Sequence, residues 1–310
     1  CGRFRMANSL ANARKTFDKK AKTFSFAARL LPKQRHNAVV RLYAFCRYMD
    51  DLADAEPAGC NSEALQQIRA EIVQGSSRNE IISDTLLIQS EFGIPLSLLL
   101  DFTDALIEDQ YPRELQTQDE LVRFGYGVAS TVGLMLCHIF GIKNPQAFPF
   151  AVDLGVAMQL TNIARDTLED AERGRIYIPK QLMSKQITCD GLLSGAEDER
   201  MTAFEGVGAI LSLADEYYAS AAQGYGFLPV AVRQAIKIAA RLYRAIGDKV
   251  VAAPNQYWQR RTVVSATTKC RLIGELLGRR ITEGSSTLII HRAEHRPRLH
   301  KALDPQRFGT

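Results

Sequence analysis

QLTNIARDTLED (residues 159–170) is the stretch that decides the fold, because it places polar side chains at regular intervals in an apolar helical pattern. Residues four positions apart lie on the same face of an α-helix. Asn162, Asp166 and Asp170 therefore form a row that is two turns long. Neighbouring carboxylates in such a row repel each other by roughly a few tenths of a kcal/mol, so we expect a cation to offset the repulsion.

RYMDDLAD (residues 47–54) carries a second acidic row, formed by Asp50 and Asp54. Both residues lie on one helical face, as in the first row. Hard divalent cations bind carboxylate oxygens, and Mg²⁺ prefers one or two carboxylates together with substrate phosphates and water. The two rows therefore predict a divalent-cation site that a phosphorylated substrate completes.

Basic side chains accompany both rows. Arg47 lies one turn before Asp50, and Arg165 directly precedes Asp166. Guanidinium groups bind phosphate oxygens through paired hydrogen bonds, while a metal ion can bridge the same phosphate to the carboxylates. Arg175 adds positive charge where the helix of residues 159–170 gives way to a loop. These companions favour a diphosphate as the ligand.

A third acidic row shows that spacing alone is weak support for metal binding. Asp101, Asp104 and Glu108 also share one helical face, but no arginine or amide belongs to that row. We therefore assign these three carboxylates to solvent. The row at residues 162–170 differs, because Gln159 and Asn162 supply amide groups on the face that leads to its carboxylates.

The spacing of apolar residues is helical almost throughout and predicts an all-α protein. Proline and glycine clusters separate the expected helices, and we find neither an alternating strand pattern nor an internal repeat. A first helix is expected between Pro32 and Pro57, and residues 184–197 are expected to form a loop. The other expected helices span residues 62–74, 80–92, 96–110, 119–141, 146–172, 198–224, 228–251 and 257–280.

This pattern predicts a single domain at residues 17–281. An N-terminal extension (residues 1–16) would precede it, and a basic, flexible tail (residues 282–310) would follow it. The arginines of the tail are compatible with weak attachment to anionic lipid, to which each basic residue adds about 1 kcal/mol.

Composition narrows the function classes. The 310 residues are 46% hydrophobic, which is enough for a large core, and the net charge of +5 is mild. This charge is compatible with a polyanionic substrate or an anionic membrane surface, and no nucleic-acid-binding motif is present. The six cysteines lack metal-ligand spacing, so we expect a reduced, cytoplasmic protein without disulfides or a zinc site. The longest apolar run, residues 132–142, is too short to span a bilayer, so from this sequence we expect neither a membrane span nor a secretory signal.

The motifs together resemble the squalene and phytoene synthase family of head-to-head prenyl synthases, over about residues 21–277. Residues 241–243 and 258–265 resemble the bacterial phytoene synthase branch most. Several linked motifs in the same order are a more specific signal than either acidic row. The matching segments are KTFS (22–25), YAFCR (43–47), DDLAD (50–54), YGVASTVG (126–133) and residues 159–179.

This resemblance implies an isoprenoid-synthase helical bundle in which the two acidic rows face each other across a central cavity. It implies Mg²⁺, or alternatively Mn²⁺, as the cofactor and two prenyl diphosphates as the substrates. The implied metal ligands are Asp50, Asp54, Asn162, Asp166 and Asp170. The implied substrate-binding residues are Lys22, Thr23, Arg47, Gln159, Asn162, Arg165 and Arg175. The implied catalytic residues, which would stabilise carbocations or steer a proton, are Tyr43, Tyr126 and Tyr243.

The implied activity is the condensation of two geranylgeranyl diphosphates to phytoene through a cyclopropyl diphosphate, a step of carotenoid biosynthesis that needs no NADPH. A squalene, presqualene-diphosphate or dehydrosqualene synthase that uses farnesyl diphosphate is the alternative. Departures from the family pattern at Ser130 and residues 107–112 leave the chain length of the substrate open. A non-catalytic helical assembly protein is the alternative from another class, and the intact acidic rows argue against it. The oligomeric state stays open.

Overall fold

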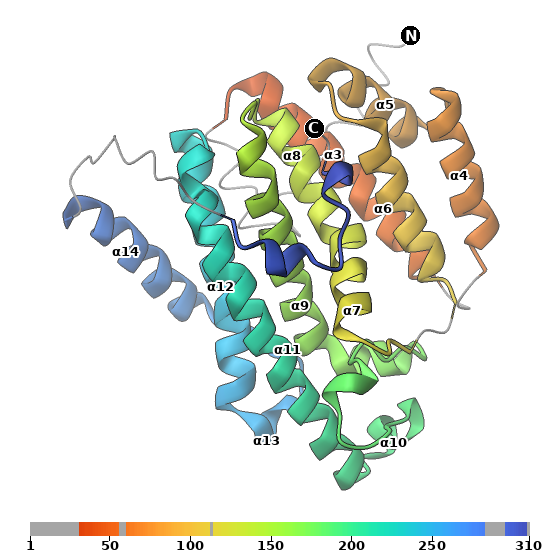
Figure 1. Cartoon of the computed structure of the whole chain (residues 1–310), viewed down its shortest axis with the longest axis vertical. Helices are drawn as coiled ribbons and strands as arrows, with labels where there is room; N and C mark the ends of the chain where they lie inside the picture. Colours follow the sequence, from red (N-terminus) through yellow and green to blue (C-terminus); the bar gives the residue numbers. More distant parts are fainter. Residues whose placement is uncertain (1–30, 56–59, 112–113, 283–294, 309–310) are drawn as a thin grey trace.

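The computed structural model describes residues 31–55, 60–111, 114–282 and 295–308, and this part of the chain is a bundle of helices (Figure 1). It contains no β-strand, only an isolated bridge between Glu114 and Ile176. The all-α prediction is therefore confirmed. The α-helices are α3 (Lys33–Ala53), α4 (Ser62–Gln74), α5 (Glu80–Phe92), α6 (Leu96–Glu108), α7 (Gln118–Gly125), α8 (Thr131–Ile139), α9 (Phe148–Glu172), α10 (Cys189–Ser194), α11 (Glu197–Gln223), α12 (Val230–Ala252), α13 (Pro254–Tyr257) and α14 (Ala266–Thr282).

The helix α9 is the centre of the bundle. It contacts α7, α8, α11 and α12, and Figure 1 shows it running through the middle of the molecule. Val152, Leu160 and Ala164 are fully buried on it. A helix that is apolar around most of its circumference belongs in a protein interior, which is why the polar residues of α9 need partners inside the protein.

A π-helical turn, η1 (Tyr126–Ser130), joins α7 to α8 without a break. The close approach of this turn to its neighbours depends on two glycines. A Cβ on Gly127 would lie 2.5 Å from the Cβ of Ala105, and one on Gly155 would lie 2.5 Å from the Cα of Ser130. This close approach lets the Ser130 hydroxyl donate a 2.7 Å hydrogen bond to the carbonyl of Val152.

Two helical stretches are long and apolar enough to cross a membrane. From the sequence we expect no such stretch, because the apolar run of residues 132–142 is too short. The two stretches are Gln118–Ile139 and Pro145–Glu172, and they are longer than the apolar run because each also includes polar positions. Their most apolar windows are 61% and 67% buried inside the protein. Buried core helices pass the same test of length and composition, so these stretches are explained by their place at the centre of the bundle.

Two boundaries differ from the sequence prediction. Residues 184–197, expected as a loop, contain α10, because the Thr188 hydroxyl accepts a 2.9 Å hydrogen bond from the Gly191 N–H and caps that helix. The helix expected at residues 257–280 begins only at Ala266, as α14, because α13 ends at Tyr257 and residues 258–265 are not helical. Ser265 caps the start of α14, because its hydroxyl accepts a 3.2 Å hydrogen bond from the Thr268 N–H.

The C-terminal segment (residues 295–308) packs against the bundle. The hydroxyl of Tyr217 donates to the carbonyl of Leu299 at 2.6 Å, and the side chain of Phe308 is 3% exposed. These residues of the expected tail therefore contribute apolar and polar groups to the packed bundle, while the domain limits and the flexibility of the tail stay predictions. Residues 283–294 and the N-terminal extension lie outside the described residues.

Candidate active site

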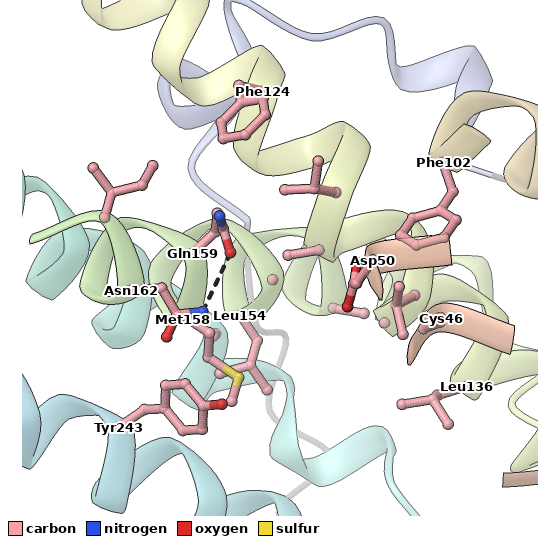
Figure 2. Close-up of a pocket in the computed structure, with 18 of the residues that line it drawn as sticks. Cys46, Asp50, Phe102, Phe124, Leu136, Leu154, Met158, Gln159, Asn162 and Tyr243 are labelled. Carbon is pink, nitrogen blue, oxygen red and sulfur yellow. Dashed lines mark hydrogen bonds between the residues drawn. The ribbon is translucent and has the colours of Figure 1, made fainter. Parts of the chain in front are cut away.

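A cavity of about 650 Å³ opens between α3, α6, α8, α9 and α12. Its inner walls are apolar, and its mouth carries the charged residues of both acidic rows. Figure 2 shows Asp50, Gln159 and Asn162 among apolar side chains of the lining such as Phe102, Leu136 and Met158. The apolar walls include Phe102, Phe124, Leu136, Phe140, Leu154 and Met158.

The structure brings the two acidic rows together at this mouth. Asp50 and Asp54 enter from α3, while Asn162, Asp166 and Asp170 enter from α9, and all five line the cavity. The apolar faces of α3 and α9 are buried in the same core. Burial of those faces directs the polar rows towards each other across the mouth.

Two of these carboxylates have too little positive charge nearby to offset their burial. Burial, followed by repulsion from the neighbouring Asp54 carboxylate, raises the pKa of Asp50 to about 7. Burial and the neighbouring Asp166 likewise raise the pKa of Asp170 well above its usual range. Within the described residues, neither carboxylate forms a hydrogen bond or an ion pair. An environment of this kind favours a bound cation or a bound proton at both positions.

Asp166 has the opposite environment. Burial would raise the pKa of Asp166, but hydrogen bonds from Arg165 and Arg261 hold it below its usual range. The Arg261 guanidinium meets the carboxylate with two parallel contacts of 2.9 Å each. Arg261 lies in a segment that carries the family resemblance, yet no pattern in the sequence assigns it to the site. Its position beside the row of α9 becomes evident only in three dimensions.

Arg175 forms a buried ionic group beside the acidic row of α3. Its guanidinium lies 3.5 Å from the Asp54 carboxylate and 3.2 Å from that of Asp109, and Arg175 is only 7% exposed. The hydroxyl of Tyr177 donates to Asp109 at 2.7 Å, and the ring of Tyr177 stacks on Phe124. Asp109 is missing from the sequence prediction, because no row or motif in the sequence marks it.

The remaining polar lining presents hydrogen-bond donors. Asn162 donates through its amide to Gln159 at 3.2 Å, as Figure 2 shows. Arg47 forms an ion pair with Asp51, but its buried Nε has no hydrogen-bond partner among the described residues. A buried donor without a partner is costly, so Arg47 is suited to a phosphate oxygen that accepts from this nitrogen.

Of the three tyrosines that the sequence predicts as catalytic, only Tyr243 lines the cavity. Burial raises the pKa of Tyr243, so its hydroxyl remains protonated. Tyr43 is half-buried beside it and is not part of the lining, although Asp50 and Tyr243 both act on its pKa.

Tyr126 is placed away from the cavity lining. Its hydroxyl donates to the carbonyl of Arg307 at 2.9 Å and approaches Asp101 at 3.3 Å, and its ring lies against Phe308. Tyr126 thus faces the C-terminal segment, and the catalytic role expected of it stays a prediction. Asp101 differs from its assignment to solvent, since its side chain is 15% exposed and meets Arg307. Lys22 and Thr23 lie outside the described residues.

The donor set fits a hard divalent cation. Carboxylate and amide oxygens converge on one opening, and the two uncompensated carboxylates, Asp50 and Asp170, belong to different rows. Oxygen ligands of this kind suit Mg²⁺, which keeps part of its coordination for phosphate and water. The site can therefore hold a metal ion and an anionic ligand above an apolar pocket.

Comparisons with known proteins agree on one family. The family model described as "Squalene/phytoene synthase" matches residues 17–268. The 15-cis-phytoene synthase of Enterobacter agglomerans is 32% identical over 276 residues, which cover 84% of this chain and 92% of that protein. The phytoene synthase of Thermus thermophilus is 34% identical over 232 residues, which cover 74% of this chain and 78% of that protein. A solved dehydrosqualene synthase in complex with a ligand matches with a TM-score of 0.70 and 25% identity, covering 89% of this chain and 98% of that one.

Proposed function

Because the chain belongs to the squalene/phytoene synthase family, whose members are prenyltransferases, we propose that it condenses two geranylgeranyl diphosphates to phytoene with the help of Mg²⁺. One observation carries the proposal: acidic rows from α3 and α9 meet arginines at the mouth of a cavity whose inner walls are apolar. Such a site accommodates the two ends of a prenyl diphosphate, one charged and one oily.

The diphosphates would bind at the mouth. Arg47, Arg165 and Arg175 supply guanidinium groups there, and Arg261 and Arg173 lie in the same lining. Mg²⁺, held by Asp50, Asp54, Asn162, Asp166 and Asp170, would supply the positive charge that stabilises the departing diphosphate. The guanidiniums hold the same oxygens by charge-assisted hydrogen bonds and orient the allylic carbon of the substrate towards the cavity.

The apolar walls would hold the two prenyl chains and exclude water. Departure of the first diphosphate leaves an allylic carbocation, which the double bond of the second substrate attacks. Loss of a proton then gives the cyclopropyl diphosphate. Departure of the second diphosphate, rearrangement and loss of a second proton give phytoene, so the overall reaction releases two diphosphates and two protons and needs no reductant. The ring of Tyr243 is suited to stabilise a carbocation in this dry environment.

A farnesyl-dependent activity is the second candidate. It is favoured by the similarity to the solved dehydrosqualene synthase, which extends over most of both chains. The two candidates share the diphosphate site and differ in how much prenyl chain the apolar walls must accommodate.

A product assay tests the proposal. The purified protein, with Mg²⁺, would receive geranylgeranyl or farnesyl diphosphate separately, with and without NADPH. We expect phytoene from the longer substrate in the absence of NADPH, and no product after Asp54→Ala or Asp166→Ala. A thirty-carbon product from the shorter substrate would favour the second candidate. If neither substrate were turned over, both candidate activities would be contradicted, and the non-catalytic assembly protein would become the favoured interpretation.

A further inference from the structure

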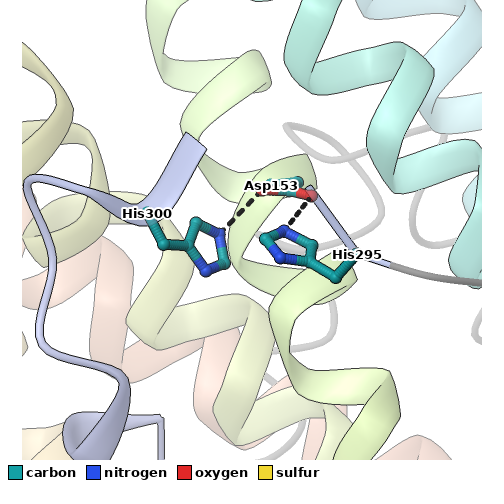
Figure 3. A group of neighbouring side chains, drawn as sticks. All are labelled: Asp153, His295 and His300. Carbon is teal, nitrogen blue, oxygen red and sulfur yellow. Dashed lines mark hydrogen bonds and ion pairs between the residues drawn. The ribbon is translucent and has the colours of Figure 1, made fainter. Parts of the chain in front are cut away.

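Three potential metal ligands meet on the side of α9 that faces the C-terminal segment. Asp153 belongs to α9, whereas His295 and His300 belong to the C-terminal segment (Figure 3). The His295 Nε2 lies 3.0 Å from one carboxylate oxygen of Asp153, and the His300 Nε2 lies 2.8 Å from the other. The ligand atoms of the three residues all lie within 4.8 Å of one another.

This cluster is separate from the proposed active site. Phe150, Ala151 and Leu154 of the same helix line the cavity, but Asp153 does not, and neither histidine does. The Asp153 side chain is completely buried and His300 is 6% exposed. A buried carboxylate with two imidazole nitrogens aimed at it has no role in the proposed prenyl transfer.

Asp153 has partners that favour its ionised form. Burial would raise the pKa of Asp153, but hydrogen bonds from His295, His300 and Ser220 hold it below its usual range. A metal-binding carboxylate must be deprotonated and an imidazole ligand must be neutral. In the structure each Nε2 is a hydrogen-bond partner of the Asp153 carboxylate, so each imidazole would carry its proton on Nδ1 instead when an ion takes the place of that hydrogen bond.

We propose that Asp153, His295 and His300 bind a divalent transition-metal ion, for which Zn²⁺ is the best match. Imidazole and carboxylate ligands suit Zn²⁺, which binds nitrogen and oxygen at about 2.0–2.2 Å in a tetrahedral arrangement. Adjacent ligands in such a tetrahedron lie roughly 3.3–3.5 Å apart. The nitrogen–oxygen distances of 2.8 and 3.0 Å therefore need to widen by only about half an ångström. Water would supply the fourth ligand, and the side chain of His295 is 15% exposed.

The ion would fasten the C-terminal segment to the central helix. Two of its ligands come from the segment and one from α9, and they are separated by 142 and 147 positions in the sequence. That separation explains why cysteine and histidine spacing in the sequence predicts no zinc site. Binding energy at a site assembled only by folding adds to the stability of the folded state, so Zn²⁺ should hold residues 295–308 against α9.

Metal binding by the full chain tests this proposal. The chelator-treated protein would be titrated with Zn²⁺, and separately with Co²⁺ as a spectroscopic probe, in excess Mg²⁺ to occupy the acidic rows. We expect one Zn²⁺ per chain, a higher melting temperature, and visible absorption bands from four-coordinate Co²⁺. Slower hydrogen exchange at residues 295–308 on addition of Zn²⁺ is expected as an independent readout.

Variants assign the ion to the cluster. His300→Ala should weaken Zn²⁺ binding by tenfold or more, in line with the 10–100-fold effects typical of changes around metal ligands. His295→Gln, which keeps a polar side chain of similar length, should weaken it as well while preserving the fold by circular dichroism. The double variant Asp50→Asn, Asp166→Asn disrupts only the acidic rows and should bind Zn²⁺ as the unmodified protein does.

Two results would overturn the proposal. One is a folded wild-type protein that binds no Zn²⁺ in excess Mg²⁺, which would leave the cluster as a hydrogen-bonded Asp–His network. The other is Zn²⁺ binding that survives His300→Ala and disappears in the acidic-row variant, which would assign the ion to the cavity mouth. Because prenyl transfer is not the readout, failure here leaves the proposed function untouched.

Discussion

The guanidinium of Arg173 donates a 3.2 Å hydrogen bond to the carboxylate of Asp54, across 119 positions of sequence. This contact ties the end of α3 to the chain that follows α9. The same carboxylate also lies 3.5 Å from Arg175. In the absence of a ligand, arginines of one half of the site therefore neutralise part of the acidic row of the other half.

Replacing these two arginines should separate folding from substrate binding. Arg175→Ala leaves the buried carboxylate of Asp109 without its cationic partner, so we expect a loss of about 3 kcal/mol of folding stability. Arg173 has a side chain that is 45% exposed, so Arg173→Ala should cost less than about 1 kcal/mol. Urea unfolding of the two variants measures the difference. Equal stabilities would contradict the buried role of Arg175.

Both arginine variants should also bind the substrate less tightly, because each loses a cation at the cavity mouth. We expect a higher KM for the prenyl diphosphate in Arg173→Ala, with little change in its melting temperature. Steady-state kinetics at fixed Mg²⁺ would show this. An unchanged KM would place Arg173 outside the substrate site.

Asp50→Asn should stabilise the metal-free protein while it abolishes turnover. Burial and Asp54 raise the pKa of Asp50 to about 7, above its ordinary value of 3.8. The folded state therefore binds a proton more readily than the unfolded state, and the resulting destabilisation grows as the pH rises from about 4 to 7. In EDTA, Asp50→Asn should therefore have a higher melting temperature than the unmodified protein, and this difference should be larger at pH 8 than at pH 5.5.

Asp51→Asn is the matched control for that experiment. Asp51 is next in sequence, but its side chain is 55% exposed and forms only a surface ion pair with Arg47. We expect the loss of this ion pair in Asp51→Asn to change the melting temperature little at either pH. If Asp50→Asn and Asp51→Asn behaved alike, the burial of Asp50 would not be the cause.

Gly155→Ala should destabilise the fold, whereas Gly208→Ala should stabilise it. A Cβ on Gly155 would meet the Ser130 backbone at 2.5–2.6 Å, so α9 and the π-helical turn would have to move apart. Overpacking of this kind costs about 1–3 kcal/mol. Gly208 lies within α11, and a Cβ added to it would have no neighbouring atom within 4 Å, so alanine gains up to about 1 kcal/mol there. Chemical unfolding of both variants would reveal opposite signs, and matching signs would refute the packing argument.

Thiol reactivity should follow burial. Burial raises the pKa of Cys137 to about 12 and also raises that of Cys46, so both remain protonated thiols at pH 8. Cys60 and Cys270 are exposed. Brief treatment with a maleimide should label the exposed pair and spare Cys46 and Cys137, as peptide mass spectrometry would show. Rapid labelling of Cys137 would mean that the cavity wall opens.

Local patterns in the sequence are sufficient for much of the fold. The limits of α4 and α5 agree with the expected residues 62–74 and 80–92, because Gly75 and Gly93 end these helices with positive φ angles that favour glycine. The two acidic rows are equally local, since their periodicity alone places the carboxylates on single faces. The helical turn thus fixes which side chains act together within one element.

Contacts between distant elements are harder to predict. Asp109 belongs to no periodic row, and its role depends on Arg175 and Tyr177, which reach it only after the chain has folded. The contacts of Tyr126 with Arg307 and Phe308 are hidden for a similar reason, because they join the π-helical turn to a segment about 180 positions further along the chain. The packing of the C-terminal segment depends on partners on α9 and α11 that sequence spacing cannot reveal.

The π-helical turn gives a single residue unusual influence over the cavity. Such a turn accommodates one residue more than the α-helical spacing. Deleting one residue between Tyr126 and Ser130 would restore an ordinary helix and rotate α7 by about 100° relative to α8. Phe124 would then leave both the cavity wall and its stack on Tyr177. In homologues, a one-residue alignment gap at this point would therefore signal a reshaped prenyl pocket even where every flanking residue is identical.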